Sequence, residues 1–187
     1  MTRAFTHLRS RDVSVVVALL VVATSPVAAQ DPPTTKAPIV ITAAPSRGDI
    51  ERAVRLEKQA EQDARFTRNW RDAATLRLRA ARLRGPTSEA IDGYRRAAWF
   101  YSASGDHGAG RRALEQGARV ALERGEPAGA IEMLLDATLL AHADGDPHQT
   151  NRLLDRSRSL LESAILPEDR RLALRARVDS AARLATR

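Results

Sequence analysis

The sequence predicts an all-α fold, a right-handed array of antiparallel helical hairpins with about seven helices. Strong helix breakers recur every twenty residues, at Gly85, Gly105, Gly125 and Gly145. Glycine favours the end of a helix because it readily adopts the left-handed conformation that follows the last turn. Between these breakers the apolar residues recur at helical spacing, and no alternating, strand-like segment follows residue 45. Short helices that stop and restart at a fixed interval are typical of stacked hairpins.

Residues 1–29 have the three regions of a secretory signal peptide. A start with three arginines leads into an apolar run over 13–23, interrupted only by Ser14, and the segment closes on the small residues 27–29. The apolar run is too short to span a bilayer comfortably. We therefore expect cleavage after Ala29 and a periplasmic or secreted mature chain, with no stable membrane span after cleavage. The alternative is an uncleaved N-terminal anchor.

Residues 30–46 are predicted to form a flexible, disordered linker rich in Pro and Thr. Four prolines fall within residues 30–45, and little in this stretch could form a packed face. The short apolar run 39–41 could add to a sheet as a strand, but an unstructured tether is favoured. The helical domain is expected to occupy 47–187.

The first two helices are predicted over 48–65 and 69–84. Ser46 and Asp49 form a capping-box pattern that opens the first. Thr67 and Asn69 favour a turn between the two. Since neither Gly nor Pro lies between Gly48 and Gly85, a single long helix is the alternative.

The remaining helices each begin just after a breaker. Thr87, Asp106 and Asp146 are good N-caps, and Pro127 and Pro147 suit a first turn. The last helix opens at Pro167 with acidic residues in its first turn. These signals predict helices over 87–104, 107–124, 127–144, 147–164 and 168–185.

A pattern of small, large and small residues recurs at the same distance from each glycine. Small residues seven positions apart let a neighbouring helix approach closely, and the large residue between them fills the gap. The segments 85–124 and 125–164 also match at many positions, which indicates an internal repeat of forty residues, two helices each. The recurring triplets are Ala90, Tyr94, Ala97; Gly110, Leu114, Gly117; Ala130, Leu134, Ala137; and Thr150, Leu154, Ser157.

This pattern resembles the tetratricopeptide repeat. The run Gly85, Ala90, Tyr94 and Ala97 is similar to the second-helix half of that repeat, and the triplet beginning at Ala130 is similar too. The resemblance covers roughly residues 70–164, with a hairpin period of forty residues in place of about 34. It implies membership of a superfamily of stacked helical hairpins, whose members mostly hold other proteins or peptides.

Composition excludes several classes of function. The 187 residues include no Cys, so disulfides, thiolate metal sites and cysteine nucleophiles are ruled out. Lys+Arg number 30 against 23 Asp+Glu, and only Lys36 and Lys58 are lysine. An exported chain with no interleaved stacking aromatics is not expected to bind nucleic acid.

The sequence shows no catalytic constellation and predicts no cofactor. No nucleophile lies beside a base, and no phosphate loop or dinucleotide motif is present. Residue types that bind metals gather only at His142, Asp144, Asp146 and His148, where helix capping by Asp146 is the favoured interpretation and no metal is predicted. We therefore expect a non-enzymatic scaffold; the alternatives are a structural homo-oligomer, or an accessory subunit or enzyme whose site the sequence does not reveal.

Two groups of residues are candidates for partner binding. Trp99 and Tyr101 lie on a helix that is apolar nearly all round; burial in the array is the favoured interpretation, and a role as binding anchors is the alternative. Arg68, Arg71, Arg79 and Arg82 are predicted to form one stripe along the second helix. A solvated face is the simpler interpretation; the sharper one is docking of an acidic protein or peptide, or peripheral contact with an anionic membrane.

Overall fold

The computed structural model describes residues 44–185. These residues include the whole of the predicted helical domain except its last two positions. The predicted signal peptide, its cleavage site at Ala29 and nearly all of the predicted linker lie outside the described residues.

Seven α-helices follow one another in the described residues, and no strand is found there. The predicted all-α array is therefore confirmed, with most helix ends within two residues of their predicted positions. The helices are α1 (Arg47–Gln62), α2 (Trp70–Leu83), α3 (Ser88–Ala103), α4 (His107–Glu123), α5 (Pro127–Ala143), α6 (Pro147–Ser163) and α7 (Glu168–Ala185).

The four predicted glycine breakers end their helices in the expected way. Each has a positive φ, between 61° at Gly85 and 80° at Gly105. After three of them the next helix begins at a capping side chain: Thr87 accepts a hydrogen bond from the amide of Ala90, Asp106 one from Ala109 at 3.0 Å, and Asp146 one from Gln149 at 2.9 Å. After Gly125 no side chain caps the helix, which begins with Pro127 in its first turn. Stop and start signals placed back to back explain the short turns.

The break between α1 and α2 is also present, but its cause differs from the glycine turns. One π-helical turn, η1 (Asp63–Thr67), ends at Arg68, which has a φ of 54°. Asn69 then caps α2 by accepting a hydrogen bond from the amide of Asp72. Two separate helices are confirmed, and the left-handed residue between them is an arginine.

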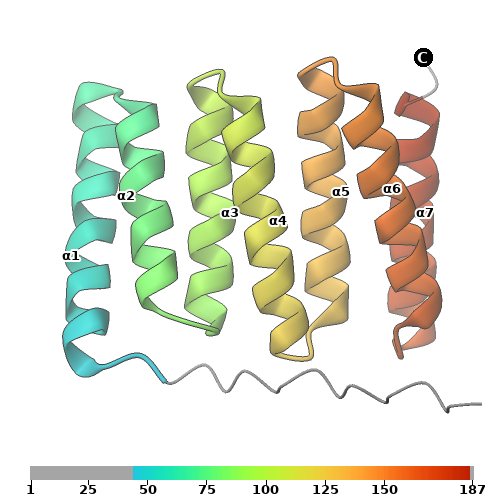
Figure 1. The fold of residues 1–187 in the computed structure, drawn as a ribbon, viewed down its shortest axis with the longest axis horizontal. Helices are drawn as coiled ribbons and strands as arrows, with labels where there is room; N and C mark the ends of the chain where they lie inside the picture. Colours follow the sequence, from blue (N-terminus) through green and yellow to red (C-terminus); the bar gives the residue numbers. More distant parts are fainter. Residues whose placement is uncertain (1–43, 186–187) are drawn as a thin grey trace, which may run out of the picture. The chain divides into compact units, whose positions relative to one another are not determined.

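The helices form two layers (Figure 1). Helices α1, α3, α5 and α7 make the odd layer, and α2, α4 and α6 make the even layer. Polar contacts join neighbours within a layer. In the odd layer these include Glu61–Arg96, Arg95–Glu132 and Asp136–Arg177, each at 3.1 Å; in the even layer they include Arg82–Gln116 at 3.0 Å and Glu115–Arg152 at 2.9 Å.

The core between the layers consists mainly of small residues. All twelve residues of the recurring triplets are buried, which confirms the predicted repeat register. A Cβ added to Gly93 would lie 2.9 Å from the Cβ of Ala81, and one added to Gly117 would lie 2.8 Å from the Cβ of Tyr94. Neighbouring helices therefore approach too closely to admit even a methyl group at these positions.

No helix within residues 44–185 is both long enough and apolar enough to cross a membrane.

Candidate binding surfaces

The odd layer carries a groove between α3 and α5, here called the odd-layer groove. It consists of two hollows of about 390 Å³ and 490 Å³ that share Arg95. The first is lined by Trp99 and Leu139, whose exposed fractions are 51% and 43%. Leu139 also lines a smaller hollow of about 160 Å³ together with the exposed Leu184 of α7. One large, exposed apolar side chain therefore lies on each of α3, α5 and α7.

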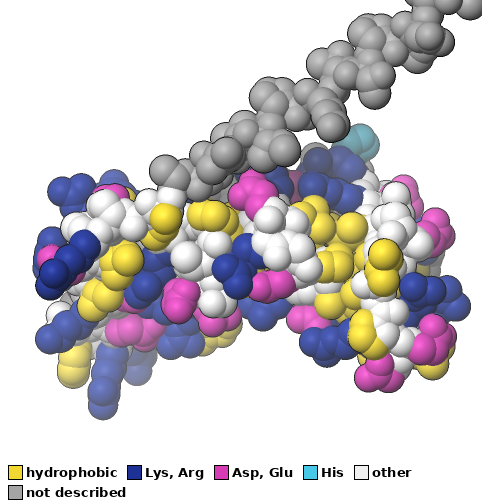
Figure 2. All heavy atoms as spheres, turned by 90° about the horizontal axis from the view of Figure 1, so that it is seen from below, with side chains coloured by type: hydrophobic (Ala, Val, Ile, Leu, Met, Phe, Trp, Pro, Cys, Tyr) yellow, Lys and Arg dark blue, Asp and Glu magenta, His cyan; other side chains and the backbone are white. Residues whose placement is uncertain are grey.

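The second hollow opens at the turn between α4 and α5, at the bottom of Figure 1. Its lining includes Ile91 of α3 and Ile165 and Leu166 of the segment before α7. This end of the array faces the viewer in Figure 2, where hydrophobic side chains lie among charges of both signs. The groove therefore combines apolar surface with a mixed polar rim.

The side chain of Trp99 is held in place although half of it is exposed. Trp70 of α2 meets it edge to face at 5.5 Å between ring centroids, and Phe100 lies at 5.3 Å. The guanidinium of Arg96 lies 5.0 Å from the Trp99 ring centroid and is itself bound by Glu61 at 3.1 Å. A ring fixed on several sides loses little further freedom when a partner covers its free face.

Ion pairs form the rim of the odd-layer groove. Glu132 contacts Arg95 at 3.1 Å and Arg170 at 3.7 Å, and Asp136 contacts Arg177 at 3.1 Å. Partial burial is the largest effect on the pKa of Asp136 and raises it; the negative charge of Glu132 adds to the rise, Arg177 and Arg95 lower the pKa, and the net shift is upward. The rim therefore holds one carboxylate whose ionisation the fold disfavours.

Tyr101, the second aromatic candidate, belongs to the core. Only 8% of its surface is exposed, and its hydroxyl lies 3.3 Å from that of Thr75 on α2. It therefore packs α2 against α3 and presents little surface to a partner, whereas Trp99 presents a ring face.

The predicted arginine stripe on α2 is not a single free surface. Arg68 lies in the turn before α2, because its left-handed backbone ends the preceding turn. Arg71 pairs with Asp106 at 3.2 Å, and Arg82 donates to Gln116 at 3.0 Å. Arg79 is exposed and lines a hollow with Arg52 of α1. Helical spacing placed these residues on one side, but it could not show that neighbouring parts of the array supply partners for two of them.

The four residues with metal-ligand side chains at the turn between α5 and α6 are not gathered into a site. Asp146 caps α6, as predicted, while His142, Asp144 and His148 are exposed. The described residues contain no group of three or more such side chains placed to hold a metal ion.

A second groove, which the sequence interpretation missed, lies between α4 and α6 in the even layer. It is lined by Arg112, Glu115, Gln116, Arg119, Arg152 and Arg156, has a volume of about 320 Å³, and is here called the arginine groove. The repeat contained a signal for it, because Arg112 and Arg152 occupy equivalent positions after Gly105 and Gly145.

Comparison with known proteins gave no match to a protein-family model, to a curated protein or to a solved structure.

Proposed function

We propose that this chain is an exported, non-enzymatic scaffold of the tetratricopeptide-like kind that binds another protein or a peptide in the cell envelope. The observation that supports this most is the half-exposed, immobilised Trp99 beside Leu139 in the odd-layer groove. Tryptophan is enriched among the residues that contribute most to binding, and such residues favour apolar hollows within a polar rim. The odd-layer groove has this composition.

The rim also limits the kind of partner. Because Arg95, Glu132 and Asp136 already pair with neighbours, a ligand need not neutralise them. The groove therefore suits a segment with an apolar side chain for the space beside Trp99 and with uncharged polar groups on either side of it. A flat, highly charged surface would leave Trp99 and Leu139 uncovered.

The test is capture of partners from the envelope fraction by the mature chain, residues 30–187. We expect the double variant Trp99→Ala, Leu139→Ala to fail to capture the proteins that the parent captures. Phe66→Ala combined with Leu172→Ala is the matched control, because Phe66 and Leu172 are exposed but line none of the three odd-layer hollows. Equal capture by the two double variants would refute a role for this groove.

Export is proposed from the leader sequence alone. The mature protein should begin at Gln30, so N-terminal sequencing of material from the native host should read Gln-Asp-Pro. Intact leader on protein from a cytoplasmic fraction would contradict the proposal.

A structural homo-oligomer is the second candidate, and one observation favours it. Ile50 and Val54 lie four residues apart on the same side of α1, the first helix of the array in Figure 1, and both are exposed within the described residues. Terminal repeats usually carry a polar outer face, so an apolar end could bury itself against another copy. Light scattering should then report an oligomer that Ile50→Glu together with Val54→Glu reduces to a monomer.

A further inference from the structure

We propose that the arginine groove of the even layer is a second docking site, and that it binds an acidic segment of a protein partner. The groove lies on the even layer and Trp99 on the odd layer, so this proposal does not depend on the function proposed for the odd-layer groove. If both hold, the chain bridges two partners, one on each layer.

Helical spacing aligns the arginines along the groove. On α4, Arg112, Gln116 and Arg119 are four and three residues apart and share one side; on α6, Arg152 and Arg156 are four apart. The two rows line one groove. Its walls therefore present guanidinium groups from both helices.

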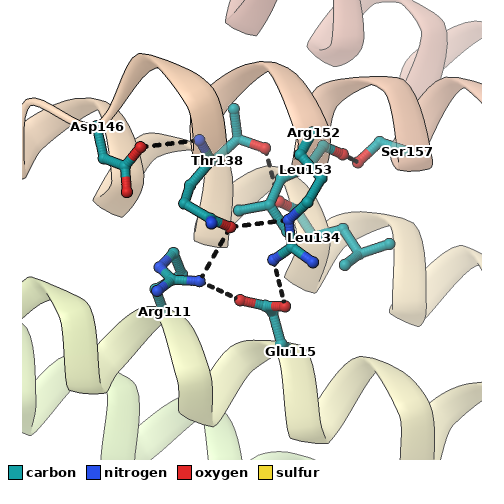
Figure 3. Close-up of polar contacts among 9 residues, drawn as sticks. Arg111, Glu115, Leu134, Thr138, Asp146, Arg152, Leu153 and Ser157 are labelled. Carbon is teal, nitrogen blue, oxygen red and sulfur yellow. Dashed lines mark hydrogen bonds and ion pairs between the residues drawn. The ribbon is translucent and has the colours of Figure 1, made fainter. Parts of the chain in front are cut away.

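The charges of the groove are not balanced. Four arginines and one glutamate line it, a net charge of +3. That glutamate, Glu115, is already bound by Arg111 at 2.6 Å and by Arg152 at 2.9 Å (Figure 3). Asp155, the neighbouring acid on α6, pairs with Arg158 instead.

Three of the arginines are therefore available to a ligand. Within residues 44–185, no carboxylate contacts Arg112, Arg119 or Arg156 at ion-pair distance. Like charges at helical spacing repel mildly, and an anion in the groove would relieve that repulsion. Guanidinium groups bind carboxylates through two parallel hydrogen bonds, which matches Glu and Asp side chains.

The surroundings favour an acidic protein segment over an anionic membrane. The large hydrophobic side chains that are exposed in the described chain lie on α1, η1, α3, α5, α7 and the segment before α7, and none lies on α2, α4 or α6. Helices that bind at a membrane surface combine cations with apolar side chains that enter the lipid. The even layer lacks that second element, and its arginines line a hollow that suits inserted side chains.

The test is the binding of a fluorescein-labelled poly-Glu peptide to the mature chain, followed by fluorescence anisotropy at about 20 mM and about 150 mM salt. The groove variant combines Arg112→Gln, Arg119→Gln and Arg156→Gln. The control variant removes three exposed arginines outside the groove, Arg52→Gln, Arg55→Gln and Arg175→Gln, so the change in net charge is the same. Circular dichroism checks the fold of both.

We expect the groove variant to bind the peptide at least about tenfold more weakly than the control at low salt, because three charge-assisted contacts are lost. Should the triple variant not fold, Gln116→Glu gives the same test, since it adds a negative charge to the groove without removing any arginine. Equal affinities of groove and control variants would overturn the proposal, as would tighter, groove-dependent binding to phosphatidylserine vesicles than to the peptide. The variant Trp99→Ala should bind the peptide as the parent does, which separates this site from the odd-layer groove.

Discussion

The close contact between α3 and α4 can be tested with a single methyl group. Gly117 of α4 faces α3, and a Cβ added there would lie 2.8 Å from the Cβ of Tyr94 and would overlap the end of Met133. The end of the Met133 side chain can rotate away. The Cβ of Tyr94 is fixed to the backbone of α3, so Gly117→Ala requires the two helices to separate.

The expected size follows from two opposing effects. Alanine in place of glycine inside a helix gains up to about 1 kcal/mol of intrinsic stability. Overpacking a tight contact costs about 1–3 kcal/mol. With the full gain subtracted from this cost, we expect Gly117→Ala to lower the free energy of unfolding by up to about 2 kcal/mol, or the Tm by up to about 6 °C for a domain of this size.

Urea denaturation and thermal melting of residues 30–187 measure this change. The control is Gly129→Ala in α5, where the nearest atom to an added Cβ is a guanidinium nitrogen of Arg95 at 4.0 Å. That variant should be as stable as the parent or more stable by up to about 1 kcal/mol. If Gly117→Ala were also stabilising, α3 and α4 would have to lie farther apart than the structure places them.

Three further variants test packing, ion pairing and protonation. Ala137→Leu places a large side chain at a fully buried contact and should cost about 1–3 kcal/mol in urea denaturation, whereas the exposed Glu123→Leu should cost little. Glu57→Gln removes the charge of a mostly buried carboxylate that two arginines bind, so chemical denaturation should show the free energy of unfolding reduced by about 1–3 kcal/mol. The same substitution at the exposed Glu51 should reduce it by less than about 0.5 kcal/mol. Because burial raises the pKa of Asp136, the folded chain holds that proton more tightly than the unfolded chain does, so stability falls as pH rises from the ordinary aspartate pKa of about 4 through the raised value. The stability of Asp136→Asn relative to the parent should therefore increase as pH rises through this window, and a difference that stays constant with pH would refute this.

The parts of the fold that could be predicted are those fixed by local chemistry. Glycine ends helices because of its backbone freedom, and the capping side chains of Asp106 and Asp146 act on amides three residues away. The triplets were recognisable because the small residues that let two helices approach closely can be identified from their residue type alone. These signals need no knowledge of distant contacts.

The parts that escaped prediction depend on contacts between distant residues. Arg68 ends a helical turn in the left-handed conformation although its side chain gives no such signal. Whether Arg71 is free depends on Asp106, which lies in the next hairpin. Trp99 and Tyr101 are two residues apart on α3, and α2 contacts both, through Trp70 and Thr75 respectively. Trp99 is nevertheless half exposed and Tyr101 buried, a difference that their spacing along the helix does not reveal.

The division between a core of small residues and charged outer faces separates the residues that stabilise the fold from those proposed to bind partners. Ala and Gly at the contacts between layers hold the hairpins together, while each partly exposed pair, such as Arg95 with Glu132, contributes about 0–1 kcal/mol. Side chains that line the two grooves can therefore change without much loss of stability. Substitutions at the exposed Arg119 should accordingly alter the proposed binding of an acidic segment while leaving Tm nearly unchanged. Substitutions at Gly117 or Ala137 should lower Tm and weaken binding at both proposed sites together.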